Sequence, residues 1–165
     1  MSKRRKKNRA VAKSTPTAEL NQILRRPDLS ILGNSVKNLP PTQWQSRMFF
    51  AGVADTDLRQ QTADQFPATL RPDMDTHPVF VLQRLSAGNL LCPCTSKGRK
   101  HRQRYIAKGC CLEMTGRVMD RDSFLVEQFT FTIPFDHSFS RKLFFQGQVP
   151  AGALCGGQPG SGERR

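Results

Sequence analysis

Two neighbouring hydroxyl side chains that lead directly into a basic segment form the stretch with the clearest chemical potential. Residues 89–94 are mostly apolar, and Thr95 and Ser96 follow them immediately before Lys97. An apolar strand is held rigidly in a core, so it fixes the position of the residues at its end. Hydroxyl groups beside guanidinium and ammonium groups suit a phosphate better than other common ligands. We therefore expect a phosphate site at Thr95 and Ser96.

The segment that follows Ser96 is strongly basic. No Asp or Glu occurs between residues 76 and 112, so no acid within the segment opposes its cations. We expect the loop over residues 97–108 to follow an RNA backbone, because clustered cations neutralise phosphates. The residues predicted to bind RNA are Lys97, Arg99, Lys100, Arg102, Arg104 and Lys108.

His77 is the candidate for acid–base chemistry beside the hydroxyl pair. Cleavage of RNA without a metal needs a base for the 2′-hydroxyl, an acid for the 5′ oxygen and positive charge near the phosphate. Histidine is the side chain suited to proton transfer near neutrality. Arg71 or a loop arginine supplies the charge, while Thr95 and Ser96 donate hydrogen bonds to a phosphate oxygen. The structural alternatives are a loop position for His77 before Pro78 and a simple strand-end turn at Thr95.

The composition indicates an anionic partner. The chain has 165 residues and a formal net charge of +13, with 26 Lys and Arg against 13 Asp and Glu. This length suits one domain with tails, and the charge suits nucleic acid. No apolar run approaches the roughly 20 residues that span a bilayer, and none follows the basic N-terminus as in a secretory signal. We expect a cytoplasmic protein that needs no cofactor and binds no membrane.

The five cysteines predict neither a disulfide framework nor a zinc site. An odd number, with Cys110 and Cys111 adjacent, favours reduced thiols. The pattern Cys92-x-Cys94 lacks the two-residue gap that is usual for zinc ligands. Cys92 and Cys94 would share one face of a strand and pack as small apolar residues. We therefore predict no metal ligand.

Local composition divides the chain into four parts. Residues 1–15 are a basic arm without acids, which self-repulsion keeps disordered. Residues 16–65 are an N-terminal extension of short helices and loops, including a polar helix near residues 56–65, and nothing before Phe66 has the pattern of a strong core element. Residues 66–150 form a β-barrel domain. Residues 151–165 are a flexible tail rich in Gly.

Five strands are predicted within the barrel domain. Apolar runs at residues 79–82 and 90–94 flank a turn and predict a β-hairpin. Residues 111–119, 123–133 and 142–149 supply the other strands. The predicted fold class is mainly β, a small and strongly curved antiparallel barrel. Its core is expected to include Val79, Val81, Leu91, Phe129, Phe131 and Ile133.

Glu127 and Gln128 stand out in the predicted strand over residues 123–133. Alternation places Glu127 on the apolar face beside Leu125 and Phe129, where a bare carboxylate is too costly to lack a partner. Two interpretations remain open: Glu127 orients His77 or an arginine, or it lies at the barrel rim. A local bulge would instead turn Glu127 outward and Gln128 inward.

Three segments resemble, in order, the signatures of the MazF/PemK family of type II toxin–antitoxin toxins. Residues 76–82 resemble a strand in which an Arg-Pro pair precedes Val- and Leu-rich residues. Residues 90–97 resemble an apolar strand that ends in Pro-x-Thr-Ser. Residues 122–129 resemble a strand that starts at Ser and carries a Gln. Together the three segments make the match moderately specific over roughly residues 70–149.

The resemblance implies a compact SH3-like β-barrel of the MazF, PemK and CcdB kind that forms a homodimer. It also implies a metal-independent endoribonuclease that cuts single-stranded RNA and is inhibited by an acidic antitoxin protein. In the family a loop arginine before the second signature and the Thr of that signature carry the chemistry. Thr95 matches this Thr, and the arginine position is occupied by His77 or displaced to Arg71.

Two functions other than an endoribonuclease remain open from the sequence. One is a non-catalytic basic module that binds RNA or DNA on the same barrel. The other is a structural or ribosome-associated protein anchored by its N-terminal arm. Cleavage of single-stranded RNA in EDTA, against binding alone, separates the enzyme from the module.

Overall fold

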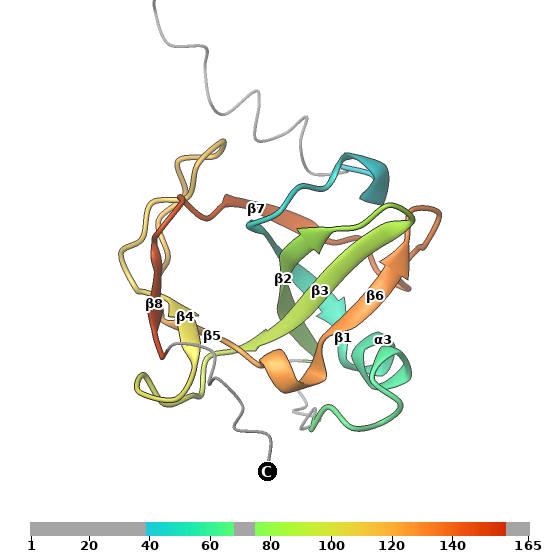
Figure 1. The fold of residues 1–165 in the computed structure, drawn as a ribbon, viewed down its shortest axis with the longest axis horizontal. Helices are drawn as coiled ribbons and strands as arrows, with labels where there is room; N and C mark the ends of the chain where they lie inside the picture. Colours follow the sequence, from blue (N-terminus) through green and yellow to red (C-terminus); the bar gives the residue numbers. More distant parts are fainter. Residues whose placement is uncertain (1–38, 68–74, 158–165) are drawn as a thin grey trace, which may run out of the picture.

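The apolar runs of the sequence form one strongly curled antiparallel sheet in the computed structural model, which describes residues 39–67 and 75–157 (Figure 1). The described residues contain eight strands, one short α-helix and two single-turn 3-10 helices. The strands are β1 (Met48–Ala54), β2 (Thr76–Arg84), β3 (Gly88–Thr95), β4 (Arg104–Ile106), β5 (Ser123–Leu125), β6 (Phe131–Pro134), β7 (Phe144–Gln148) and β8 (Leu154–Gly156). The helices are α3 (Asp55–Gln61), η2 (Pro41–Gln43) and η3 (Glu127–Phe129). The predicted mainly β, antiparallel class is confirmed.

β3 is the central strand of the sheet. The strand order is β7-β1-β2-β3-β5-β4-β8, and β6 also pairs with β3. β6 lies along the first half of β3, where Leu91 pairs with Phe131, and β5 lies along its end, where Thr95 pairs with Phe124. Figure 1 shows β4, β5 and β8 curving away from the group of β1, β2, β3 and β6. β3 therefore connects both parts of the molecule and ends at the predicted phosphate site.

The predicted hairpin and most of the predicted core are confirmed. β2 and β3 pair antiparallel, with Val81 opposite Leu91. Five of the six predicted core residues are buried, and Phe129 is half-buried against the same cluster. The five are Val79, Val81, Leu91, Phe131 and Ile133. Burial of side chains of this size stabilises a fold by roughly 1.5–3 kcal/mol each.

The expectation that residues 16–65 hold only short helices and loops is wrong at β1. β1 pairs with β2 on one side and with β7 on the other. Because both faces of this strand are covered, its apolar residues run continuously instead of alternating. Phe50 belongs to one buried cluster and Phe49 to the other. The polar helix after β1 is confirmed as α3, and it begins at Asp55.

Two predicted strands are interrupted. Residues 111–119 form a tight irregular loop, because the backbone at Met114 and Gly116 adopts positive φ angles of 69° and 67°. Only two isolated bridges form there, between Cys111 and Val118 and between Glu113 and Gln148. Residues 123–133 split into β5 and β6 around η3. Leu91 pairs with Phe131 and Cys94 pairs with Leu125, so three steps along β3 correspond to six steps along the other segment. η3 is thus a three-residue insertion in a strand that otherwise follows β3.

The ends of the chain also differ from expectation or lie outside the described residues. The predicted tail contains β8, which pairs with β4 through Tyr105 and Cys155. The basic arm at 1–15, Arg71 and residues 158–165 lie outside the described residues. Within the described ranges, no helix is long and apolar enough to cross a membrane.

Candidate functional site

A cleft of about 520 Å³ opens where β2 begins and β3 ends, and we call it the strand-end cleft. Three of the four predicted catalytic residues line it, namely His77, Thr95 and Ser96. The register that pairs Val79 with Pro93 brings the start of β2 to the level of the end of β3. Residues that lie apart in the sequence therefore line one cleft. The fourth predicted residue, Arg71, lies outside the described residues.

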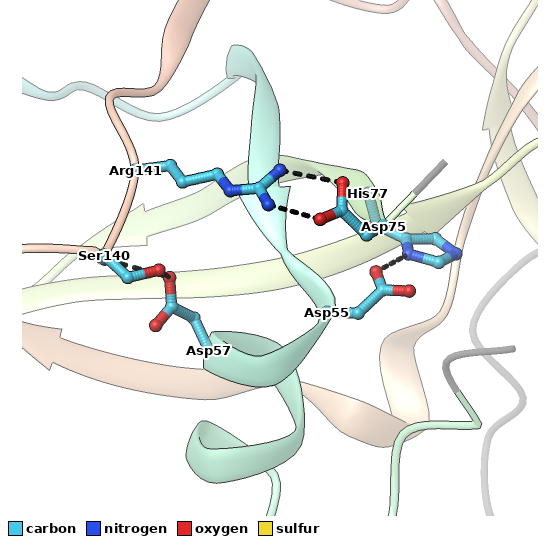
Figure 2. A network of polar contacts seen from close by, with 6 residues as sticks. All are labelled: Asp55, Asp57, Asp75, His77, Ser140 and Arg141. Carbon is cyan, nitrogen blue, oxygen red and sulfur yellow. Dashed lines mark hydrogen bonds and ion pairs between the residues drawn. The ribbon is translucent and has the colours of Figure 1, made fainter. Parts of the chain in front are cut away.

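His77 is held from behind by a buried carboxylate. Its Nδ1 lies 2.5 Å from Oδ1 of Asp55, whose side chain is 1% exposed while that of His77 is 21% exposed (Figure 2). A carboxylate only accepts hydrogen bonds, so Nδ1 carries the proton and Nε2 is the acceptor in a neutral imidazole. The ring of Phe66 contacts the imidazole edge-on at 5.1 Å between centroids. His77 therefore presents a fixed tautomer in the cleft.

Asp55 is the functional residue that sequence reasoning missed. It is the first residue of α3, directly after β1, and its backbone N–H donates to the carbonyl of Asp75 at 2.8 Å. Its second oxygen, Oδ2, is buried without a hydrogen-bond partner among the described residues. Burying a charged group without partners costs free energy. Packing alone therefore does not favour a carboxylate at the position of Asp55. The available signal was an acid immediately after an apolar run.

A polar network fastens the elements that carry Asp55 and His77. Figure 2 shows that Arg141 reaches the carboxylate of Asp75, next to the start of β2, through both terminal nitrogens. The Arg141 guanidinium lowers the pKa of Asp75 through this hydrogen bond. Ser140 donates its N–H and hydroxyl to Oδ2 of Asp57 on α3, at 3.0 and 2.7 Å. The segment before β7 thus ties α3 to the start of β2.

Thr95 lies in a strand-end turn and still lines the cleft. The N–H of Lys97 donates to Oγ1 of Thr95 at 3.2 Å, which is the predicted structural alternative. This contact uses a lone pair of the hydroxyl and leaves its O–H available as a donor. Ser96, the next residue, is exposed. The turn and the phosphate site are therefore compatible.

The opposite wall of the cleft carries both signs of charge. Arg117, Asp120, Arg121 and Asp122 line it. Asp120 pairs with Arg121 at 2.9 Å, and Asp122 pairs with Lys100 at 2.8 Å. Within the described residues Arg117 and Lys97 make no ion pair. The cations of the cleft that are free to meet an anion are therefore Lys97 and Arg117.

The expectation that the basic loop is unopposed is wrong for two of its residues. Arg104 binds the carboxylate of Glu127 through Nε, at 3.2 and 3.3 Å, and through Nη2. Glu127 raises the pKa of Arg104. Asp122 accepts from Nζ of Lys100 and from the N–H of Lys108, and the Lys100 bond is the main cause that lowers its pKa. Both acids follow residue 112 in the chain, so the composition of residues 76–112 does not reveal that they pair with the loop.

Three of the other loop cations line a second, shallow depression, which we call the basic hollow. Its lining residues are Lys97, Gly98, Arg99, Arg102, Gln103 and Gln128. Gln103 accepts from the N–H of Arg99 at 3.0 Å and keeps the loop turned. Lys97 lines both the hollow and the strand-end cleft. Lys100, Arg104 and Lys108 line neither.

Glu127 and Gln128 lie in the 3-10 helix η3 and not in a strand. Glu127 is half-buried and pairs with an arginine, which was one of the two open interpretations. It does not contact His77, whose carboxylate partner is Asp55. Gln128 is exposed at the basic hollow. The strict alternation that would have placed Glu127 in the core is wrong because η3 interrupts the strand.

Cys92 and Cys94 have a packing role. Both are fully buried on β3, and burial raises the pKa of the Cys92 thiol to about 12. Thiols that stay protonated are poor nucleophiles. In the parts of the chain that the structure describes, no three His, Cys, Asp or Glu residues gather as a metal would require.

Comparison with known proteins gives no relative: no protein-family model, curated protein or solved structure matches the chain.

Proposed function

We propose that this protein is an endoribonuclease that cleaves single-stranded RNA and resembles the MazF/PemK toxins. The observation that carries the proposal is the Asp55–His77 pair, which lines one cleft together with the hydroxyl of Thr95 and the free cation Lys97. These groups are a base, a hydrogen-bond donor and a positive charge. They are the components that cleavage through the 2′-hydroxyl of RNA requires, without a metal ion.

The proposed step is an attack of the 2′-oxygen on the adjacent phosphorus. Nε2 of His77 accepts the 2′-hydroxyl proton, the new bond from the 2′-oxygen to phosphorus forms, and the bond from phosphorus to the 5′ oxygen breaks. Thr95 and Lys97 stabilise the charge that develops on the phosphate oxygens. The imidazolium formed from His77 is the proton source for the departing 5′ oxygen. The products are a 2′,3′-cyclic phosphate and a 5′-hydroxyl.

The test is incubation of the purified full chain with a long single-stranded RNA in EDTA. We expect discrete fragments that carry cyclic phosphate and 5′-hydroxyl ends. Thr95→Ala should slow cleavage by about 10²-fold or more, the range seen when a single donor to a transition state is removed. Thr95→Ser, which keeps a hydroxyl in the same turn, is the matched control. Fragments whose yield is the same with Thr95→Ala would exclude this site as their source.

A non-catalytic module that binds RNA or DNA is the second candidate. The basic hollow favours it, because the exposed side chains of Arg99 and Arg102 have no acidic partner among the described residues. Such a surface holds a phosphate backbone without any chemistry. Binding of single-stranded nucleic acid with full recovery of intact RNA would favour the module over the enzyme.

A further inference from the structure

Phe144 is an aromatic side chain that the fold leaves uncovered. Its exposed fraction is 56%, and only Met114 and Val118 are comparably exposed large apolar residues in the described part of the chain. Phe144 is the first residue of β7, and its neighbour Phe145 packs in the core. A single exposed apolar side chain is ordinary on a protein surface, so what distinguishes Phe144 is its position beside the strand-end cleft.

The ring of Phe144 lies against a residue that lines the strand-end cleft, although Phe144 itself is not among the lining residues. Phe144 pairs with Ala51 across β1 and β7, and Ala51, Gly52 and Gln146 all line the cleft. A Cβ atom on Gly52 would lie 3.1 Å from Cδ2 of Phe144, so the ring rests directly over this glycine. Gln146 follows two residues along β7, at the point where the pairing of β1 with β7 shifts its register. The ring therefore lies at the edge of the cleft.

The position of the ring at the edge of a cleft whose lining includes free cations points to a nucleotide. Lys97 and Arg117 line the cleft, and a phosphate held there would bring an attached base within reach of its walls. A single-stranded nucleic acid is bound by this combination, in which cations meet the backbone and an aromatic ring stacks on a base. Val118, which is 57% exposed and lines the cleft, offers a second apolar contact.

We propose that Phe144 is a stacking platform for an RNA base adjacent to the phosphate in the strand-end cleft. This inference rests on the proposed function and adds a specificity-determining residue to it. Stacking is tolerant of sequence because every base has an aromatic face. The platform therefore selects unpaired over paired RNA, because a base within a duplex is already stacked on both sides.

The first experiment measures the affinity of the full chain for a 2′-O-methylated single-stranded oligonucleotide, which lacks the attacking hydroxyl and stays intact. We expect Phe144→Ala to weaken binding roughly tenfold, as removal of one stacking contact does. Phe144→Trp should bind at least as well as the wild type. Phe144→Leu keeps an apolar side chain without an aromatic face, so it should weaken binding like Phe144→Ala. Met114→Ala, an exposed apolar residue outside the cleft lining, is the matched control and should have no effect.

The second experiment places a single abasic nucleotide at each position of the oligonucleotide in turn. We expect one position at which the wild type loses about tenfold in affinity and Phe144→Ala loses nothing more. The platform would be refuted if Phe144→Leu bound the intact oligonucleotide as tightly as the wild type. It would also be refuted if the wild type bound more tightly than Phe144→Ala by the same factor at every abasic position. A change of oligomeric state in Phe144→Ala would refute it as well, because the ring would then be a subunit contact. A wild type that does not bind RNA would instead refute the proposed function itself.

Discussion

The strand-end cleft and the basic hollow share Lys97 but are built in different ways. In the cleft, His77 and Thr95 stand on paired strands, and a carboxylate that is 1% exposed lies behind the histidine. The hollow stands on a loop, and the side chains of Arg99 and Arg102 around it are exposed. Chemistry needs groups fixed to a fraction of an ångström, whereas attraction of a polyanion does not. Under the proposed function, the cleft would carry out the reaction and the hollow would hold the RNA.

Removal of the His77 imidazole should have the largest effect. It should lower the cleavage rate and leave RNA binding at the basic hollow unchanged. We expect His77→Ala to reduce the cleavage rate by about 10²- to 10⁴-fold, the usual contribution of a general base. RNA affinity should stay within about twofold, because the cations of the hollow are unchanged. Single-turnover cleavage and equilibrium binding measure the two effects. His101→Ala, an exposed histidine of the loop, is the control, and an equal loss there would count against the division of roles.

Replacement of the carboxylate behind His77 should have the next largest effect. Asp55→Asn keeps the shape of the side chain but removes the charge that orients the imidazole and stabilises its protonated form. We expect a decrease in the cleavage rate of about tenfold to a hundredfold with unchanged affinity for RNA. Asp57→Asn, which lies on the same helix and contacts Ser140 instead, is the matched control. Equal rates for Asp55→Asn and the wild type would show that the imidazole needs no orienting partner.

Removal of the positive charges of the basic hollow should have a moderate effect. It should lower the affinity for RNA without lowering the cleavage rate at saturation. Arg99→Ala combined with Arg102→Ala should make the slope of log affinity against log salt shallower by about 1.4, or 0.7 per lost contact on a single strand. Lys100→Ala should change this slope less, because Lys100 already pairs with Asp122. At saturating RNA the cleavage rate of the double variant should match the wild type. A loss of rate at saturation would break the comparison between the two regions.

Detachment of the loop from Asp122 should have the smallest effect. The Lys100 hydrogen bond is the largest cause that holds the pKa of Asp122 below its usual value, so this carboxylate stabilises the fold above about pH 4, where it would also be ionised in the unfolded chain. The stabilisation is lost as the pH falls further, through the folded-state pKa. We expect Asp122→Asn to lower the melting temperature slightly at pH 7. The difference from the wild type should shrink below about pH 4. A difference that is constant with pH would mean that the hydrogen bonds, and not the charge, matter.

Much of the sheet could be predicted because its residues carry local signals. The runs around Val81 and Leu91, separated by a turn, specify a hairpin with no information from the rest of the chain. β1 could not be predicted in the same way. It contains Gly52 and gains its stability from β2 on one side and β7 on the other, which the sequence pattern does not reveal. Its pairing partners are set by tertiary contacts.

The candidate site could be predicted only in part for a similar reason. His77 and Thr95 were found because each lies beside a strand signal of its own. Asp55 was missed because an acid at the start of a helix is ordinary, and only the fold brings it to His77. The pairing of Arg104 with Glu127 was open for the same reason, since η3 shifts Glu127 out of the strand that alternation predicted.

The pairing of β1 with β7 determines when during protein synthesis the sheet can be completed. Met48 lies opposite Gln148, so about one hundred residues separate the partners along the chain. At a synthesis rate of about 5–20 residues per second, β1 waits roughly 5–20 s before its second neighbour exists. Asp55, His77 and Thr95 are all made during that interval, yet Gln146 and the ring over Gly52 still have to arrive. We expect the cleft to be completed only after β7 has been made, so Asp55, His77 and Thr95 wait for the last part of the wall beside them.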